Sequence, residues 1–224
     1  MKLKKIASLA LAGIMAVSML TACGEGGSSS SEPTTPVTPT TGVADGANSV
    51  ASDYGKSLNL VYNEDSDLLT ALTKAAADCY KSKDIEDAVT NKGYEGVKAS
   101  AKQSNIVEKI SKSLAGTETA IGADYSIFKN IASEGTKKYA VVYTIGGNFD
   151  INQAGAMVAQ YLNGTNAGGV VNNTNMPSVN GTKQLKADYS ADIAAVKLTS
   201  NDSSSKSIWV VTVLFTQTVT SAKA

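Results

Sequence analysis

The chain has 224 residues, a hydrophobic fraction of 42%, and 20 basic against 20 acidic residues. It contains no histidine, and all of its basic residues are lysine. The lack of histidine excludes Ser-His-Asp and Cys-His catalysis, imidazole-ligated zinc and a histidine pH switch. The lack of arginine removes the bidentate guanidinium ligand for phosphate groups, so we expect no nucleic-acid partner.

Residues 1–22 have the pattern of an export signal. Three of the first five residues are lysine, and an apolar stretch follows over residues 6–20. This stretch is shorter than the about 20 residues of a membrane-spanning helix. It ends in Leu20-Thr21-Ala22-Cys23, which resembles the lipobox of bacterial lipoproteins. The resemblance implies cleavage before Cys23, a diacylglyceryl group on its sulfur, and a protein anchored to the outer face of the bacterial cell membrane.

Residues 23–44 have the composition of a disordered linker. Glycine and serine dominate its first half, and threonine and proline its second half. Such a segment buries too little apolar surface to offset the entropy of ordering. We therefore expect a flexible spacer, followed by a single α+β extracytoplasmic domain over residues 45–224. Without the three signal lysines, 17 lysines oppose 20 acidic residues, a net charge near −3.

Apolar residues at helical spacing predict four helices. The clearest spans residues 67–80, with Ser66 as its N-cap and Cys79 on its apolar face as a small core residue. The other three are expected at residues 84–92, 105–115 and 150–163.

The ends of these three helices also carry signals. Asn105 and Glu108 have the spacing of a capping box. Asp150, with Gln153 three residues on, begins the last helix. Glycines at 93 and 164 are expected to end the helices that precede them.

Alternating apolar residues predict two hairpins, one in residues 125–145 and one in residues 186–219. Ala-Asp-Tyr-Ser opens both, at 123–126 and at 187–190, which suggests two duplicated helix-plus-hairpin units. The last strand is apolar on both faces, so we expect part of its second face to be covered. The predicted fold is one four-stranded antiparallel sheet with about four helices packed mainly on one face.

Candidate metal and catalytic motifs have simpler explanations. The acids of Asn63-Glu64-Asp65-Ser66-Asp67 offer oxygen ligands for calcium, but they lack the EF-hand glycine and distal glutamate and precede a helix that they can cap. Ser-x-x-Lys occurs at 126–129 and 203–206 without its partner motifs, which indicates chance. Residues 146–150 lead into a helix N-terminus that could bind an anion, but Asp150 would occupy it. We expect no metal and no cofactor.

Residues 163–182 form a long polar loop with Asn-x-Thr triplets at Asn163, Asn172 and Asn180. Loops of this length are usually functional or disordered. We therefore expect this loop and the hairpin tips to form the contact region.

Together, the anchor and the missing catalytic groups favour a non-enzymatic binding or structural module whose ligand is an envelope protein or glycan. One alternative is a carboxylate-dependent envelope hydrolase, which needs two acids roughly 5 to 10 Å apart. A second is a degenerate CAP domain. Leu60-Val61-Tyr62-Asn63-Glu64 before an alanine-rich helix, with apolar strands closing the chain, resembles the secreted CAP (SCP-like) domains. The histidines and acids of that family's cavity are not matched, so this likeness implies no site residue.

Overall fold

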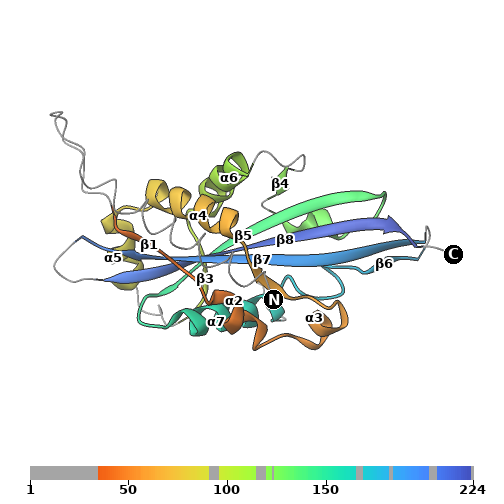
Figure 1. Cartoon of the computed structure of the whole chain (residues 1–224), viewed down its shortest axis with the longest axis horizontal. Helices are drawn as coiled ribbons and strands as arrows, with labels where there is room; N and C mark the ends of the chain where they lie inside the picture. The colour runs from red at the N-terminus through yellow and green to blue at the C-terminus, as the bar shows by residue number, and fades with distance from the viewer. Residues whose placement is uncertain are drawn as a thin grey trace, which may run out of the picture.

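The computed structural model describes residues 35–90, 96–114, 120–122, 124–164, 169–181, 184–201 and 206–222. Cys23, the signal, the first part of the linker, Gly93 and Ser203 lie outside the described residues. The elements, in chain order, are β1 (Val37–Thr40), α2 (Val43–Asn48), α3 (Asp53–Ser57), β2 (Tyr62–Glu64), α4 (Ser66–Cys79), α5 (Ser82–Thr90), β3 (Lys98–Ala99), α6 (Gln103–Ser113), β4 (Ile121–Gly122), the 3₁₀ helix η2 (Tyr125–Phe128), β5 (Gly135–Gly146), α7 (Ile151–Asn163), β6 (Val179–Asn180), β7 (Leu185–Thr199) and β8 (Ser207–Ser221) (Figure 1).

Three long antiparallel strands, in the order β7-β8-β5, form the centre of a single eight-stranded sheet. The predicted hairpin of residues 186–219 is confirmed, since β7 and β8 pair from Leu185 with Ser221 to Thr199 with Ser207. Short strands cover the outer edges of this centre: β1, β2 and β6 lie along β7, and β3 and β4 along β5. They pair with β7 at residues 185–186, 191–193 and 195–198 and with β5 at residues 138–139 and 143–144, so they cover the two outer edges in part.

The predicted four-stranded antiparallel sheet is wrong. The sheet is mixed, because β2 pairs with β7 and β4 with β5 in parallel. Its first expected hairpin does not form: the segment before β5 begins with η2, and β5 pairs with β8 instead. The two Ala-Asp-Tyr-Ser copies also differ, since Asp124 caps η2 whereas residues 187–190 lie within β7. The tetrapeptide therefore gives no support to a duplication.

Side chains replace a strand partner for the segment of residues 127–131. Its backbone carbonyls accept hydrogen bonds from three side chains on β5, β6 and β8, which satisfy backbone groups that a sheet would otherwise pair. The bonds run from Lys137 Nζ to Ile127 and to Asn130, at 2.9 Å each, from Gln217 Nε2 to Phe128 at 3.1 Å, and from Asn180 Nδ2 to Ile131.

Helices cover both faces of the sheet rather than mainly one. Helices α4, α5 and α6 pack on the face that carries Ala140, Val142 and Val210. Helices α2 and α7 pack on the opposite face, with Tyr139 and Tyr143. Figure 1 shows α4 and α6 on one side of the long strands, and α2, α3 and α7 on the other. The fold is thus an α+β sheet between two helical layers.

Part of the segment with linker composition belongs to this fold. β1 pairs antiparallel with β7, from Val37 opposite Leu198 to Thr40 opposite Ala195. Pro39 suits this edge position, since proline cannot donate a hydrogen bond to a further strand. The expected linker over residues 23–44 therefore overlaps the folded part at its C-terminal end.

Candidate functional site

The lipobox resemblance depends on Cys23, which lies outside the described residues, so its lipidation stays a prediction. Within the ranges given above, no helix is both long and apolar enough to cross a membrane. The other cysteine, Cys79, is partly buried near the end of α4, where it packs against the core as predicted. Burial raises the pKa of its thiol above the ordinary value, which disfavours the thiolate that a nucleophile or metal ligand requires.

The acids before α4 act as helix caps. Asp65 is the N-cap, and its Oδ1 accepts a hydrogen bond from the backbone N–H of Leu68 at 2.7 Å. Ser66, the predicted cap, is instead the first residue of the helix. Glu64 accepts hydrogen bonds from the backbone N–H groups of Gly42 and Ala44 at the start of α2. Among the described residues, no group of three or more potential ligands could hold a metal ion.

Two other predicted helix starts have different outcomes. The Asp150–Gln153 capping box is present at the start of α7, with hydrogen bonds of 2.8 and 3.0 Å. The Asn105–Glu108 box is wrong, because α6 already begins at Gln103 and has no side-chain cap. Since Asp150 itself caps α7, we assign no anion site there.

No hydrogen bond joins the side chains of Ser126 and Lys129 in the first Ser-x-x-Lys match, both of whose residues are described. Ser126 lies in η2, and its backbone N–H is bound by Asp124 at 2.8 Å. The Lys129 ammonium lies over the ring of Tyr125, 5.2 Å from its centroid. The second match includes Ser203, outside the described residues.

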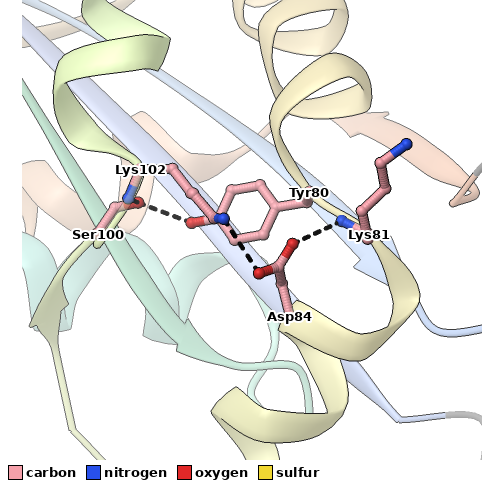
Figure 2. A network of polar contacts seen from close by, with 5 residues as sticks. All are labelled: Tyr80, Lys81, Asp84, Ser100 and Lys102. Carbon is pink, nitrogen blue, oxygen red and sulfur yellow. Dashed lines mark hydrogen bonds and ion pairs between the residues drawn. The ribbon is translucent and has the colours of Figure 1, made fainter.

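A polar network joins the end of α4, the start of α5 and the connection from β3 to α6 (Figure 2). The Tyr80 hydroxyl lies 2.7 Å from Ser100 Oγ, which accepts a hydrogen bond from the backbone N–H of Lys102 at 3.1 Å. The Lys102 ammonium is 3.1 Å from Asp84, whose other oxygen accepts the Lys81 backbone N–H at 2.9 Å. Because these groups bind one another, the network fastens three elements of the helical layer.

The described part of the 163–182 loop is folded onto the core. Its apolar residues Val170, Val171 and Met176 are buried. Asn172 Oδ1 accepts hydrogen bonds from two backbone N–H groups, and Asn175 Nδ2 donates to the carbonyl of Gly169 at 2.7 Å. The apolar side chains of this part of the loop thus pack on the core, whereas Asn173, Thr174, Val179 and Gly181 are exposed, so its role as a contact region stays a prediction.

The uncovered region lies on the sheet itself. Helices α4 to α6 cover only one half of their face, and the other half carries polar side chains, most of them short, in two cross-strand rows. The six residues that form these two rows are exposed or half-exposed. We call this region the open sheet face; its rows are Thr136, Thr218 and Asp188, and Lys138, Thr216 and Ser190.

Asp192 lies at the border between the open sheet face and the covered half. Its side chain is half-buried, and burial raises the pKa of its carboxyl group above the ordinary value. The nearby carboxylate of Asp65 raises this pKa further, whereas the ammonium of Lys138 lowers it. An acid that holds its proton longer than usual beside a second acid is the arrangement that general acid catalysis would use. Asp65, however, already caps α4.

No protein-family model, no curated protein and no solved structure matches this chain. The sequence did not point to the open sheet face or to Asp192. Alternation in the last strand showed that one face is more polar, but which half of that face the helices cover depends on packing between segments far apart in the chain.

Proposed function

We propose that this protein is a lipid-anchored bacterial surface module that binds or organises an envelope component without catalysis. The order of its first 23 residues supports export and lipid anchoring: basic residues, an apolar stretch and Leu20-Thr21-Ala22-Cys23. Its partner would be an envelope protein or glycan, and its membrane contact would be the lipid on Cys23.

The observation that carries the proposal is the position of the open sheet face relative to the point where the chain enters the domain. Entry is beside Thr199, whose backbone N–H donates to the carbonyl of Pro36 at 3.2 Å. This is the end of the sheet where Thr199 pairs with Ser207. Thr218 lies eleven residues further along β8, roughly 36 Å away at about 3.3 Å per residue. A tether before Thr35 would thus present the open sheet face away from its point of attachment.

The chemistry of this face suits reversible contact with a hydrated partner. Hydroxyl groups of threonine and serine can each donate and accept hydrogen bonds. One lysine and one aspartate leave the face close to neutral. Large exposed apolar side chains among the described residues are limited to Val61 and Val179, neither of which lies on this face.

Retention of envelope material tests the binding role. Immobilised protein should capture a glycan or protein from envelope fractions, and the double variant Thr136→Lys/Thr218→Lys should lose it. The matched control Ser104→Lys/Asn105→Lys adds the same charge at exposed positions of α6 and should retain it. Equal capture by both variants would remove the open sheet face from the proposal. A catalytic rate on envelope substrates that a point change abolishes would overturn the non-enzymatic role.

A separate experiment tests the lipid anchor on Cys23. The wild-type protein should incorporate a labelled fatty acid and sediment with membranes, and Cys23→Ala should do neither. Unchanged labelling of Cys23→Ala would contradict the lipid anchor.

The carboxylate-dependent hydrolase is a second candidate, because Asp192 is half-buried on β7 near Asp65 and burial raises the pKa of its carboxyl group. If this candidate is right, the purified protein releases soluble fragments from envelope polysaccharide and Asp192→Asn abolishes the release. If no fragments form, the candidate is excluded.

A further inference from the structure

The chain contains two Asn-Gly pairs, Asn163-Gly164 and Asn180-Gly181. In such a pair the backbone nitrogen of the glycine can attack the asparagine side chain, because glycine has no side chain to hinder the approach and reaches many backbone conformations. We infer that Asn180 is a site of spontaneous deamidation and that the fold protects Asn163. This inference does not depend on the proposed function.

The reaction needs only water. The Gly181 nitrogen forms a bond to Cγ of Asn180, and the side-chain nitrogen leaves as ammonia with the proton that the Gly181 nitrogen gives up. Water then opens the resulting succinimide ring at either carbonyl, which yields aspartate or isoaspartate. Each product replaces a neutral amide by a carboxyl group, and nothing is oxidised or reduced.

The surroundings of the two pairs differ at the attacking nitrogen. Gly164 N–H donates to the carbonyl of Tyr161 at 3.2 Å, and Asn163 lies in α7 with its Nδ2 bound to the carbonyl of Val50 at 2.8 Å. Hydrogen bonds therefore hold both reacting groups of this pair, the Gly164 N–H and the Asn163 side-chain amide. The Gly181 N–H makes no hydrogen bond to any described residue.

Gly181 also has room to move. It follows the last residue of β6, and a side chain built on it would meet nothing within 4 Å. The space beside Gly181 is thus open, which favours the backbone movement that the succinimide ring requires, whereas Asn180 itself pairs with Leu185. One restraint on Asn180 is the hydrogen bond from its Nδ2 to the carbonyl of Ile131.

Deamidation would break that restraint. An ionised carboxyl group has no proton to donate, so it would face the Ile131 carbonyl as a second acceptor. This bond holds β6 to the segment of residues 127–131 (in Figure 1, β6 lies at the end of the sheet that carries the C-terminus). The modification would therefore loosen the contact between β6 and this segment and add a negative charge at that end.

Mass spectrometry of the full chain, aged in mildly alkaline buffer under native conditions, tests the inference. Met176 lies between the two pairs, so cleavage after methionine places them in separate peptides. The Asn180 peptide should gain one mass unit about tenfold faster than the Asn163 peptide, because Asn163 must first open locally. In denaturant the two rates should become similar.

Two results would overturn the inference: native deamidation of Asn163 at the rate of Asn180 or faster, or an intact Asn180 after the unfolded chain has reacted completely. Gly181→Ala supplies the matched variant. The open space around Gly181 accepts the added methyl group, so this variant should fold and its Asn180 should react more slowly.

Discussion

The side-chain amide of Gln217, on β8, donates a hydrogen bond to the backbone carbonyl of Phe128, 3.1 Å away. The same nitrogen donates to the Tyr189 hydroxyl at 2.7 Å, and that hydroxyl donates in turn to the carbonyl of Pro177 at 2.8 Å. Gln217 is fully buried. One side chain on the central strand thus connects η2 with the segment that precedes β6, two parts of the chain that no strand pairing joins.

Gln217→Glu should destabilise the fold strongly at neutral pH. The substitution keeps the shape of the side chain but replaces the donor by an ionised oxygen that faces the Phe128 carbonyl. An uncompensated buried charge costs about 3 kcal/mol or more. Urea denaturation at neutral pH measures this loss, and part of it should be recovered in acid, where a protonated carboxyl can donate again. Thr218→Glu, exposed on the next residue, should change stability by less than about 1 kcal/mol; equal effects of the two variants would contradict the role of Gln217.

The contact between α2 and α7 should not tolerate a methyl group at Gly155. A Cβ atom there would lie 2.1 Å from the backbone oxygen of Val43, and one at Gly46 would lie 1.9 Å from that of Asn152. Backbone atoms cannot move aside as a flexible side chain can, so we expect Gly155→Ala to cost at least the about 1–3 kcal/mol typical of overpacking. Thermal unfolding measures the effect. Gly96→Ala, where a Cβ would meet nothing within 4 Å, is the control and should unfold close to the wild type.

The parts of the fold with a local signal could be predicted from the sequence. The apolar residues of α4 recur at helical spacing, and Asp150 and Gln153 have the spacing of a capping box. Strand β7 alternates over its first half, and β8 is a long, mostly apolar run. Interactions between distant residues determine the rest. Residues 125–131 have the apolar content of a strand, but side chains from β5, β6 and β8 satisfy their carbonyls instead. Likewise β1, which contains Pro39 and follows Pro36, has no strand signal of its own and is ordered by pairing with β7.

The candidate site likewise combines features that the sequence predicts with features that depend on contacts between distant residues. That no His-based or arginine-based site exists follows directly from composition. The open sheet face required knowledge of the register between β5, β7 and β8, because only the register brings Thr136, Thr218 and Asp188 into one row. Asp192 stands out only once the packing of α4 half-buries it beside Asp65.

Two alanine substitutions distinguish the observed cap of α4 from the one that its sequence suggested. Asp65→Ala removes the oxygen that accepts the Leu68 N–H at 2.7 Å and should cost about 0.5–2 kcal/mol. Ser66→Ala, inside the first turn, should be close to neutral, since alanine is the best helix former. Chemical denaturation of both variants checks this pair. A larger loss for Ser66→Ala than for Asp65→Ala would show that the helix begins one residue later.

Asp192→Asn should make the protein more stable at neutral pH, and the gain should vanish in acid. Burial, with Asp65 second, raises the pKa of the Asp192 carboxyl in the folded state. As the pH rises through the unfolded value of about 3.9, the unfolded chain releases this proton first, so folding loses stability until the folded pKa is passed. Below both values the carboxyl is neutral in either state, and wild type and variant should differ little.

Urea denaturation near pH 7 and near pH 3 measures the difference between wild type and Asp192→Asn, with exposed Asp188→Asn as the matched control on the same strand. A gain at pH 7 that disappears at pH 3, for Asp192→Asn and not for the control, is the expected result, since an unpaired half-buried charge opposes folding only while it is ionised. A difference that is the same at both pH values would mean that Asp192 acts through shape rather than charge. That result would also remove the physical basis of the hydrolase alternative, which requires this carboxyl to hold its proton longer than an ordinary aspartate.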